Sequence, residues 1–141
     1  MSDLYRQLPE DPNVPSGADG LDLLADWLAE MLPKHRYNHA QYTKGRVENI
    51  DNLIHGCGTA VCALGCLPLI PQFVARGWQY WAGFPFRHNK DDDPISSATE
   101  EFGIHIYTAV PIFVSDIGKS RDEVISQLRE LADKLRRESA P

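Results

Sequence analysis

The sequence has no run of apolar residues that approaches the ~18 needed to cross a membrane. Its first residues, MSDLYRQLPEDPNVP, contain neither the basic nor the apolar region of a secretion signal, so a cytoplasmic location is the default prediction. A dense run of lysine and arginine is also missing, and 14 basic against 20 acidic side chains give a net charge of -6. We therefore expect neither nucleic acid nor a membrane as a partner.

Catalytic signatures are equally scarce. The chain contains no glycine-rich phosphate loop, no H-E-x-x-H, no G-x-S-x-G and no paired-carboxylate signature. What it does contain is the composition of a globular protein, with 43% hydrophobic and 24% charged residues. This combination favours a small non-enzymatic interaction or binding protein over an enzyme, and no cofactor is expected.

Length and periodicity predict a single compact domain, because 141 residues suffice to bury one core without staples. Residues 1–18 carry three prolines and are expected to form an extended N-terminal arm, anchored by Leu4, Tyr5 and Leu8. Residues 19–141 then form a single helical domain. Apolar spacing and end signals there predict a mainly α fold of about five or six short helices with at most a small β-hairpin.

The individual helices are predicted from spacing, caps and helix breakers. Asp93 and Pro94 are typical of a helix start, and Gly103 is typical of a helix end. Ser120 and Glu123 form a capping box before an apolar repeat, which makes the last helix the clearest. The other predicted segments are residues 19–32, a turn within 47–54, and residues 59–67, 70–76, 94–102 and 105–115.

All three cysteines occur in one stretch, NLIHGCGTAVCALGCLPLIP, residues 52–71. The favoured interpretation is structural, with the cysteines acting as small buried hydrophobic groups. Small residues would let this helix approach its neighbours closely; they are Gly58, Ala60, Ala63 and Gly65.

Two chemical interpretations stay open. Cys62 and Cys66 would share one face of the predicted helix, and with His55 and Cys57 they could bind zinc, although the usual C-x-x-C spacing is absent. Cys57 alone is a candidate nucleophile, because it precedes a helix N-terminus, where the helix dipole lowers the pKa of a thiol. The alternative function is therefore a cysteine-dependent enzyme or a zinc-binding protein centred on Cys57 and Cys62.

The segment WQYWAGFPFRHNKDDD, residues 78–93, favours a short hairpin or an ordered loop. Its aromatic side chains offer a large contact area with few rotatable bonds, so they are candidates for binding a protein partner if they are not core residues. These candidates are Trp78, Tyr80, Trp81, Phe84 and Phe86. Self-association through the apolar stripe of the last helix is a second candidate mode; the stripe is Val124, Leu128, Leu131 and Leu135.

The string CGTAVCALG at residues 57–65, followed by IPQF at 70–73, resembles a group of uncharacterised small proteins from bacterial and phage genomes. These proteins share a C-G-T-x-x-C-x-x-G signature, and the resemblance extends to EFGI at 101–104 and to the capped last helix. It implies a phage or prophage association and no established activity. It also implies that Cys66 is less essential than Cys57 and Cys62.

Overall fold

The computed structural model of the chain describes residues 4–39, 42–45, 47, 49–55, 60–87, 93–114 and 119–139. Within these residues the fold is mainly α, as the sequence predicts. The helices are α1 (Gly17–Met31), α2 (Ile50–His55), α3 (Pro71–Val74), α4 (Pro94–Phe102), α5 (Ile106–Phe113) and α6 (Arg121–Ser139), with the 3-10 helices η1 (Lys34–Arg36) and η2 (Leu64–Leu69). The strands form two antiparallel pairs, β1 (Thr43–Lys44) with β2 (Ala60–Val61), and β3 (Trp78–Trp81) with β4 (Phe84–Arg87).

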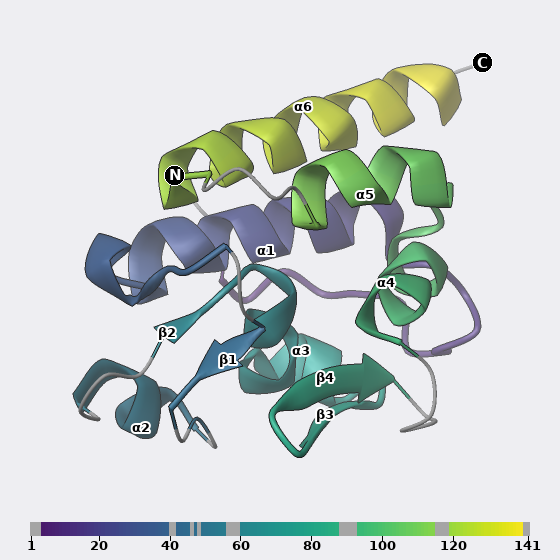
Figure 1. The fold of residues 1–141 in the computed structure, drawn as a ribbon. Coiled ribbons are helices and arrows are strands. Elements are labelled where there is room, and N and C mark those ends of the chain that lie inside the picture. Colours follow the sequence, from purple (N-terminus) through teal and green to yellow (C-terminus); the bar gives the residue numbers. More distant parts are fainter. Residues whose placement is uncertain are drawn as a thin grey trace.

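The two longest helices, α1 and α6, lie side by side in antiparallel orientation (Figure 1). Ion pairs link their polar flanks, with Arg129 2.7 Å from Asp26 and Arg136 2.6 Å from Asp22. The apolar stripe of α6 belongs to the core, where its buried residues are Val124, Leu128, Leu131 and Ala132. The stripe is therefore used within the domain, and the predicted self-association through it is corrected. No helix in the described part of the chain combines the length and apolar character that a bilayer crossing requires.

Local end signals place several helices correctly. The capping box is confirmed, since Glu123 N donates to Ser120 Oγ at 3.1 Å and Ser120 N donates to Glu123 Oε1 at 3.3 Å. The Asp93 carboxylate accepts from Ser96 N at 2.7 Å at the start of α4, and Gly103 ends that helix with a φ of 67°. Helices α2, α3 and α5 overlap the predicted ranges 47–54, 70–76 and 105–115.

The helix predicted over residues 59–67 does not form in the described part of that range. Residues 60 and 61 are strand β2, and helical structure begins only with the 3-10 helix η2. The cause is a close approach of two segments: a Cβ atom at Gly65 would overlap the carbonyl oxygen of Tyr42. That oxygen also accepts a hydrogen bond from Cys62 N at 3.3 Å. Pairing with β1 therefore overrides the local helical spacing, although the need for a small residue at position 65 was anticipated.

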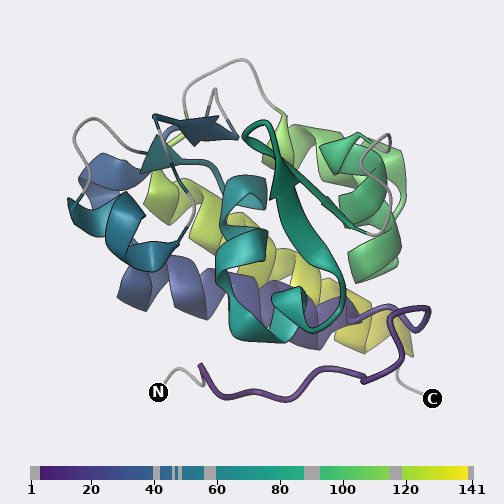
Figure 2. The ribbon, with the colours of Figure 1, turned by 90° about the horizontal axis from the view of Figure 1, so that it is seen from below.

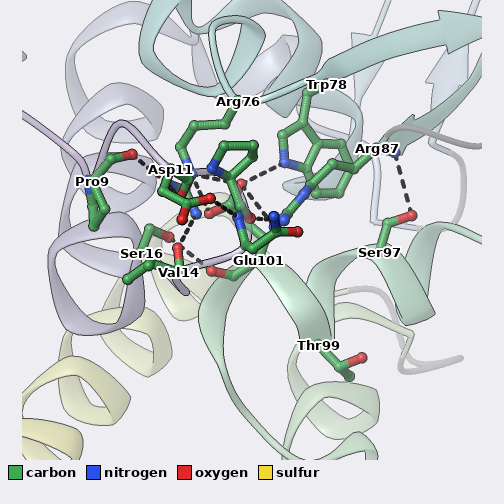
Figure 3. A network of polar contacts seen from close by, with 12 residues as sticks. Pro9, Asp11, Val14, Ser16, Arg76, Trp78, Arg87, Ser97, Thr99 and Glu101 are labelled. Carbon is green, nitrogen blue, oxygen red and sulfur yellow. Dashed lines mark hydrogen bonds and ion pairs between the residues drawn. The ribbon is translucent and has the colours of Figure 1, made fainter.

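A buried charge cluster, which consists of Arg76, Arg87 and Glu101, joins α4 to the β3–β4 hairpin (Figure 3). The Glu101 carboxylate is fully buried and accepts hydrogen bonds from Arg76 Nε at 2.8 and 3.1 Å. Trp78 Nε1 donates to the same carboxylate at 2.9 Å, and Arg87 Nη1 lies 3.6 Å from it. An isolated buried carboxylate would be very costly, so these cationic and indole partners allow Glu101 to remain in the core.

The arm, residues 4–15, runs along one side of the molecule before α1 begins at Gly17, two residues earlier than predicted (Figure 2). Leu4 and Leu8 pack against the core as expected, whereas Tyr5 is 88% exposed and its ring is not part of the core. Further anchors come from the charge cluster, whose two guanidinium groups donate to four arm carbonyls: those of Pro9, Asp11, Pro12 and Val14.

Replacing the buried carboxylate should destabilise the whole domain. Glu101→Gln keeps the side-chain shape but leaves Arg76 and Arg87 without their counter-ion, and breaking a buried ion pair in this way costs about 3 to 5 kcal/mol. Urea unfolding followed by circular dichroism measures this loss. The control is Glu100→Gln, one residue earlier on the exposed face of α4, which should change the free energy of unfolding by less than about 0.5 kcal/mol. Equal effects of the two substitutions would contradict the assignment of the cluster as a stabilising centre.

Candidate functional site

The thiols of Cys62 and Cys66 are free and buried. Cys62 precedes η2 and Cys66 lies within it, so the two do not share a face of an α-helix as predicted. Burial raises the pKa of the Cys62 thiol to about 11, and burial together with the nearby Cys62 raises the pKa of Cys66 well above its usual value. Both thiols are therefore protonated at neutral pH and act as small apolar groups, as the structural interpretation expects.

The chemical interpretations rest mainly on residues that the structure does not describe. Cys57 and the side chain of His55 lie outside the described residues. Among the side chains that are described, no three His, Cys, Asp or Glu residues gather as a metal site would require. Zinc needs thiolate ligands, and burial of Cys62 and Cys66 opposes the loss of their protons. The zinc and nucleophile readings remain predictions.

The β3–β4 hairpin divides the five aromatic candidates between the core and the surface. Trp78 is 1% exposed and Phe86 is also buried, so both are core residues rather than contact residues. Tyr80 is half-buried, and its hydroxyl donates to the carbonyl oxygen of Gly65. Trp81 and Phe84, in contrast, are 55% and 54% exposed.

The two exposed rings flank a two-residue turn, and we call residues 81–84 the hairpin tip. Trp81 and Phe84 are directly paired across the strands, so both side chains leave the same face of the hairpin. Ala82 and Gly83 both have a positive φ, of 51° and 83°, as a type I′ turn requires. Alanine is strained in this left-handed region, and backbone strain of this kind is common at functional sites.

Strand β1 and the residue before it hold the hairpin tip in place. Thr43 Oγ1 donates to the carbonyl oxygen of Gly83 at 2.8 Å. The ring of Tyr42 meets that of Phe84 edge to face, with centroids 6.0 Å apart and an angle of 62° between the planes. Tyr42 and Thr43 therefore hold the hairpin tip at Phe84 and Gly83, so its position does not depend on the hairpin alone.

His39 is a second unusual group, because it is only 7% exposed and yet titratable. Its Nδ1 lies 2.8 Å from the hydroxyl of Tyr37, while its buried Nε2 has no hydrogen-bond partner among the residues that the structure describes. Burial lowers the pKa of His39, Lys119 lowers it further, and Glu123 acts in the opposite direction. A ring with one free nitrogen in the interior is held in its neutral form.

Sequence reasoning missed the charge cluster and the burial of His39. One signal for Glu101 was available: it lies three residues after Ala98 and next to Phe102, on the buried face of α4. A charged residue on an apolar helix face calls for a buried partner. Nothing in the sequence identifies Arg76 and Arg87 as those partners, since they lie in different elements.

No protein-family model matches the chain, and comparison with curated proteins and with solved structures also finds no match.

Relieving the strained turn should stabilise the domain. Ala82→Asn creates the Asn-Gly pair that type I′ turns prefer, and removing alanine from the left-handed region should add about 1 kcal/mol to the free energy of unfolding. Urea denaturation of both proteins measures the gain. The same substitution at Ala75, an exposed alanine with a φ of -61°, should give no gain. A stabilisation that is equal at both positions would show that strain at Ala82 is not its cause.

His39 should make the domain less stable in mild acid. Its pKa lies below 6.5 in the folded chain and near 6.5 in the unfolded chain, so the unfolded state binds the proton more readily. The free energy of unfolding should therefore fall as the pH decreases through about 6.5. Melting temperatures between pH 7.5 and 5.5 should fall more steeply for the wild type than for His39→Gln. His35→Gln, at an exposed histidine, should keep the wild-type slope; a wild-type slope in His39→Gln would refute the assignment.

Proposed function

We propose that the chain is a small non-enzymatic binding protein that contacts another protein through its hairpin tip. The observation that carries the proposal is the pair of exposed rings, Trp81 and Phe84, on a strained turn that strand β1 holds in place. Tryptophan and other aromatic side chains dominate the binding energy of protein interfaces, which supports a contact role for this pair.

The fixed geometry of the tip supports binding further. Loss of rotamer freedom is one of the main costs of association, and aromatic side chains have only two rotatable bonds. Tyr42 already contacts the ring of Phe84, and Thr43 fixes the turn through Gly83. Much of the ordering has therefore taken place before a partner arrives.

The chemistry of the tip indicates the kind of partner. Two adjacent apolar rings on a convex turn fit a protein that offers an apolar pocket of matching size. The net charge of -6 favours approach to a partner whose surface is basic around that pocket. A cytoplasmic location and a phage or prophage association complete this proposal, and both rest on the sequence alone.

A cysteine-dependent enzyme or a zinc protein centred on Cys57 and Cys62 has less support. The buried, protonated thiol of Cys62 is a poor nucleophile and a poor metal ligand. No described feature favours this alternative over a binding role.

The proposal is tested by substitution at the tip. The immobilised chain is exposed to an extract of the cells that encode it, retained proteins are identified by mass spectrometry, and the affinity of the purified partner is measured by calorimetry. Trp81→Ala and Phe84→Ala should each weaken binding about 30-fold, which corresponds to a hot-spot loss of 2 kcal/mol. Both variants should lose no more than about 1.5 kcal/mol of stability, the value of an aromatic pair such as Phe84 with Tyr42, whereas Trp78→Ala should lose about 3 to 5 kcal/mol.

The matched control is Tyr107→Ala, which removes an exposed aromatic ring from α5 instead of from the tip. It should leave affinity unchanged. A partner that binds Trp81→Ala and Phe84→Ala as tightly as the wild type would contradict the proposal, and so would a chain that retains no protein at all.

A further inference from the structure

Side chains of the domain hold the arm through hydrogen bonds to its main-chain carbonyl oxygens. Gln72 Nε2 donates to the carbonyl oxygens of Leu4 at 2.7 Å and Arg6 at 3.2 Å. Arg76 donates to the carbonyls of three more arm residues, Pro9, Asp11 and Val14, and Arg87 donates to that of Pro12 (Figure 3). Six arm carbonyls thus accept from three side chains of the domain.

Most arm residues are exposed to solvent. Leu4 and Leu8 are partly buried against the core, while seven other arm residues are exposed: Tyr5, Gln7, Glu10, Asp11, Asn13, Val14 and Pro15. Pro9 and Pro12 have no backbone N–H, so these positions offer only a carbonyl to a partner. Val14 N donates to the carbonyl oxygen of Asp11 at 3.0 Å, so the arm contains a turn at residues 11–14. Proline restricts the free chain, so a segment of this kind loses little chain entropy when it binds.

The arm does not fill the space that it covers. A cavity of about 480 Å³ lies between the arm and the region of α3 and is lined by Gln7, Leu8, Pro9 and Glu10 on one side and by Pro71, Gln72, Ala75 and Arg76 on the other. Protein cores are close-packed, so this gap distinguishes the arm contact from the packing of the helices. The arm rests in its groove through the six carbonyl contacts and through Leu4 and Leu8.

The junction between the arm and α1 is anchored to the domain. Ser16 is buried, and its N and Oγ donate to the carbonyl oxygen of Glu101 at 2.7 and 3.0 Å. An exchange would therefore leave Ser16 and α1 in place and move only residues 4–15. Exchange of a terminal segment between identical chains is a low-cost route to dimers.

We propose that Gln72, Arg76 and Arg87 form a binding site for a proline-containing, turn-forming peptide segment, and that its occupant in a dimer is the arm of a second copy. Each copy places its arm in the groove of the other, where the arm makes the contacts that it makes here with its own chain. This site lies at the base of the β3–β4 hairpin and does not involve the hairpin tip, so the two interactions are independent.

The binding site is tested first with a fluorescent synthetic peptide of residues 4–16 and the full-length chain. Leu8→Ala in the chain weakens its own arm and vacates the groove more often, so the peptide should bind this variant about tenfold more tightly than the wild type. Leu8→Ala in the peptide should have the opposite effect and weaken binding. Fluorescence anisotropy measures both, and circular dichroism confirms that the variant is folded.

Two further chains control this measurement. Arg6→Ala loosens the arm by removing its ion pairs with Asp19 at 3.2 Å and with the buried Asp26 at 3.9 Å, and it should also tighten peptide binding if Leu8→Ala proves unfolded. Asn13→Ala, at an exposed arm residue, should leave the affinity unchanged. The proposed site would be overturned if folded Leu8→Ala or Arg6→Ala bound no peptide up to ~1 mM. It would also be overturned if the peptide bound these variants and the wild type with the same affinity.

The second copy is tested by mixing ¹⁵N-labelled and unlabelled full-length chains, each with a photoreactive phenylalanine analogue in place of Glu10. Light scattering at high concentration should show a dimer, and mass spectrometry should find cross-links from labelled arms to residues 71–76 of unlabelled chains. A chain that stays monomeric, or cross-links within single chains only, would overturn the exchange even if the peptide binds. Trp81→Ala should leave the cross-links unchanged, which separates this result from the test of the hairpin tip.

Discussion

The rest of the structure depends on the hydrogen bonds and ion pairs that the buried carboxylate of Glu101 makes. It lies near the end of α4 and is bonded to Arg76 after α3 and to Trp78 at the start of β3. Arg87 at the end of β4 completes the set. One side chain therefore fixes the position of the hairpin base relative to two helices. Two guanidinium groups around one carboxylate leave a surplus of positive charge, and the arm carbonyls are the dipoles that surround it.

The hairpin connects this interior cluster to the surface because strand residues alternate between two faces. Trp78, Tyr80 and Arg87 lie on the inner face, toward the cluster and η2, while Trp81 and Phe84 lie on the outer face. The position of the exposed pair therefore follows from the anchoring of the base. Thr43 and Tyr42 support the hairpin at its other end, through Gly83 and Phe84. The hairpin is therefore held both at its base and at its tip.

How far the sequence predicts this structure depends on the range of the interactions involved. The ends of α4 and the start of α6 were predicted correctly because Asp93, Gly103 and the Ser120–Glu123 box act within one helical turn. The prediction of a helix over residues 59–67 was wrong because this segment packs closely against Tyr42. No local pattern in the sequence reveals that contact. The aromatic segment was recognised as a hairpin or loop, but which of its rings would be buried depended on Glu101, 23 residues beyond Trp78.

The charge cluster also explains why polar groups are kept in a core that could have been apolar. Burying ions costs desolvation free energy, and apolar replacements of similar volume are often equally stable or more stable. An apolar cluster, however, could not donate hydrogen bonds to the carbonyls of Pro9, Asp11 and Val14. The carbonyl of Asp11 also accepts from Val14 N, but those of Pro9 and Val14 accept from no other donor in the described residues, and without Arg76 they would have to face water. The cost of burying Arg76 and Arg87 is thus offset by a function that only donors can perform, which is to hold the arm by its backbone.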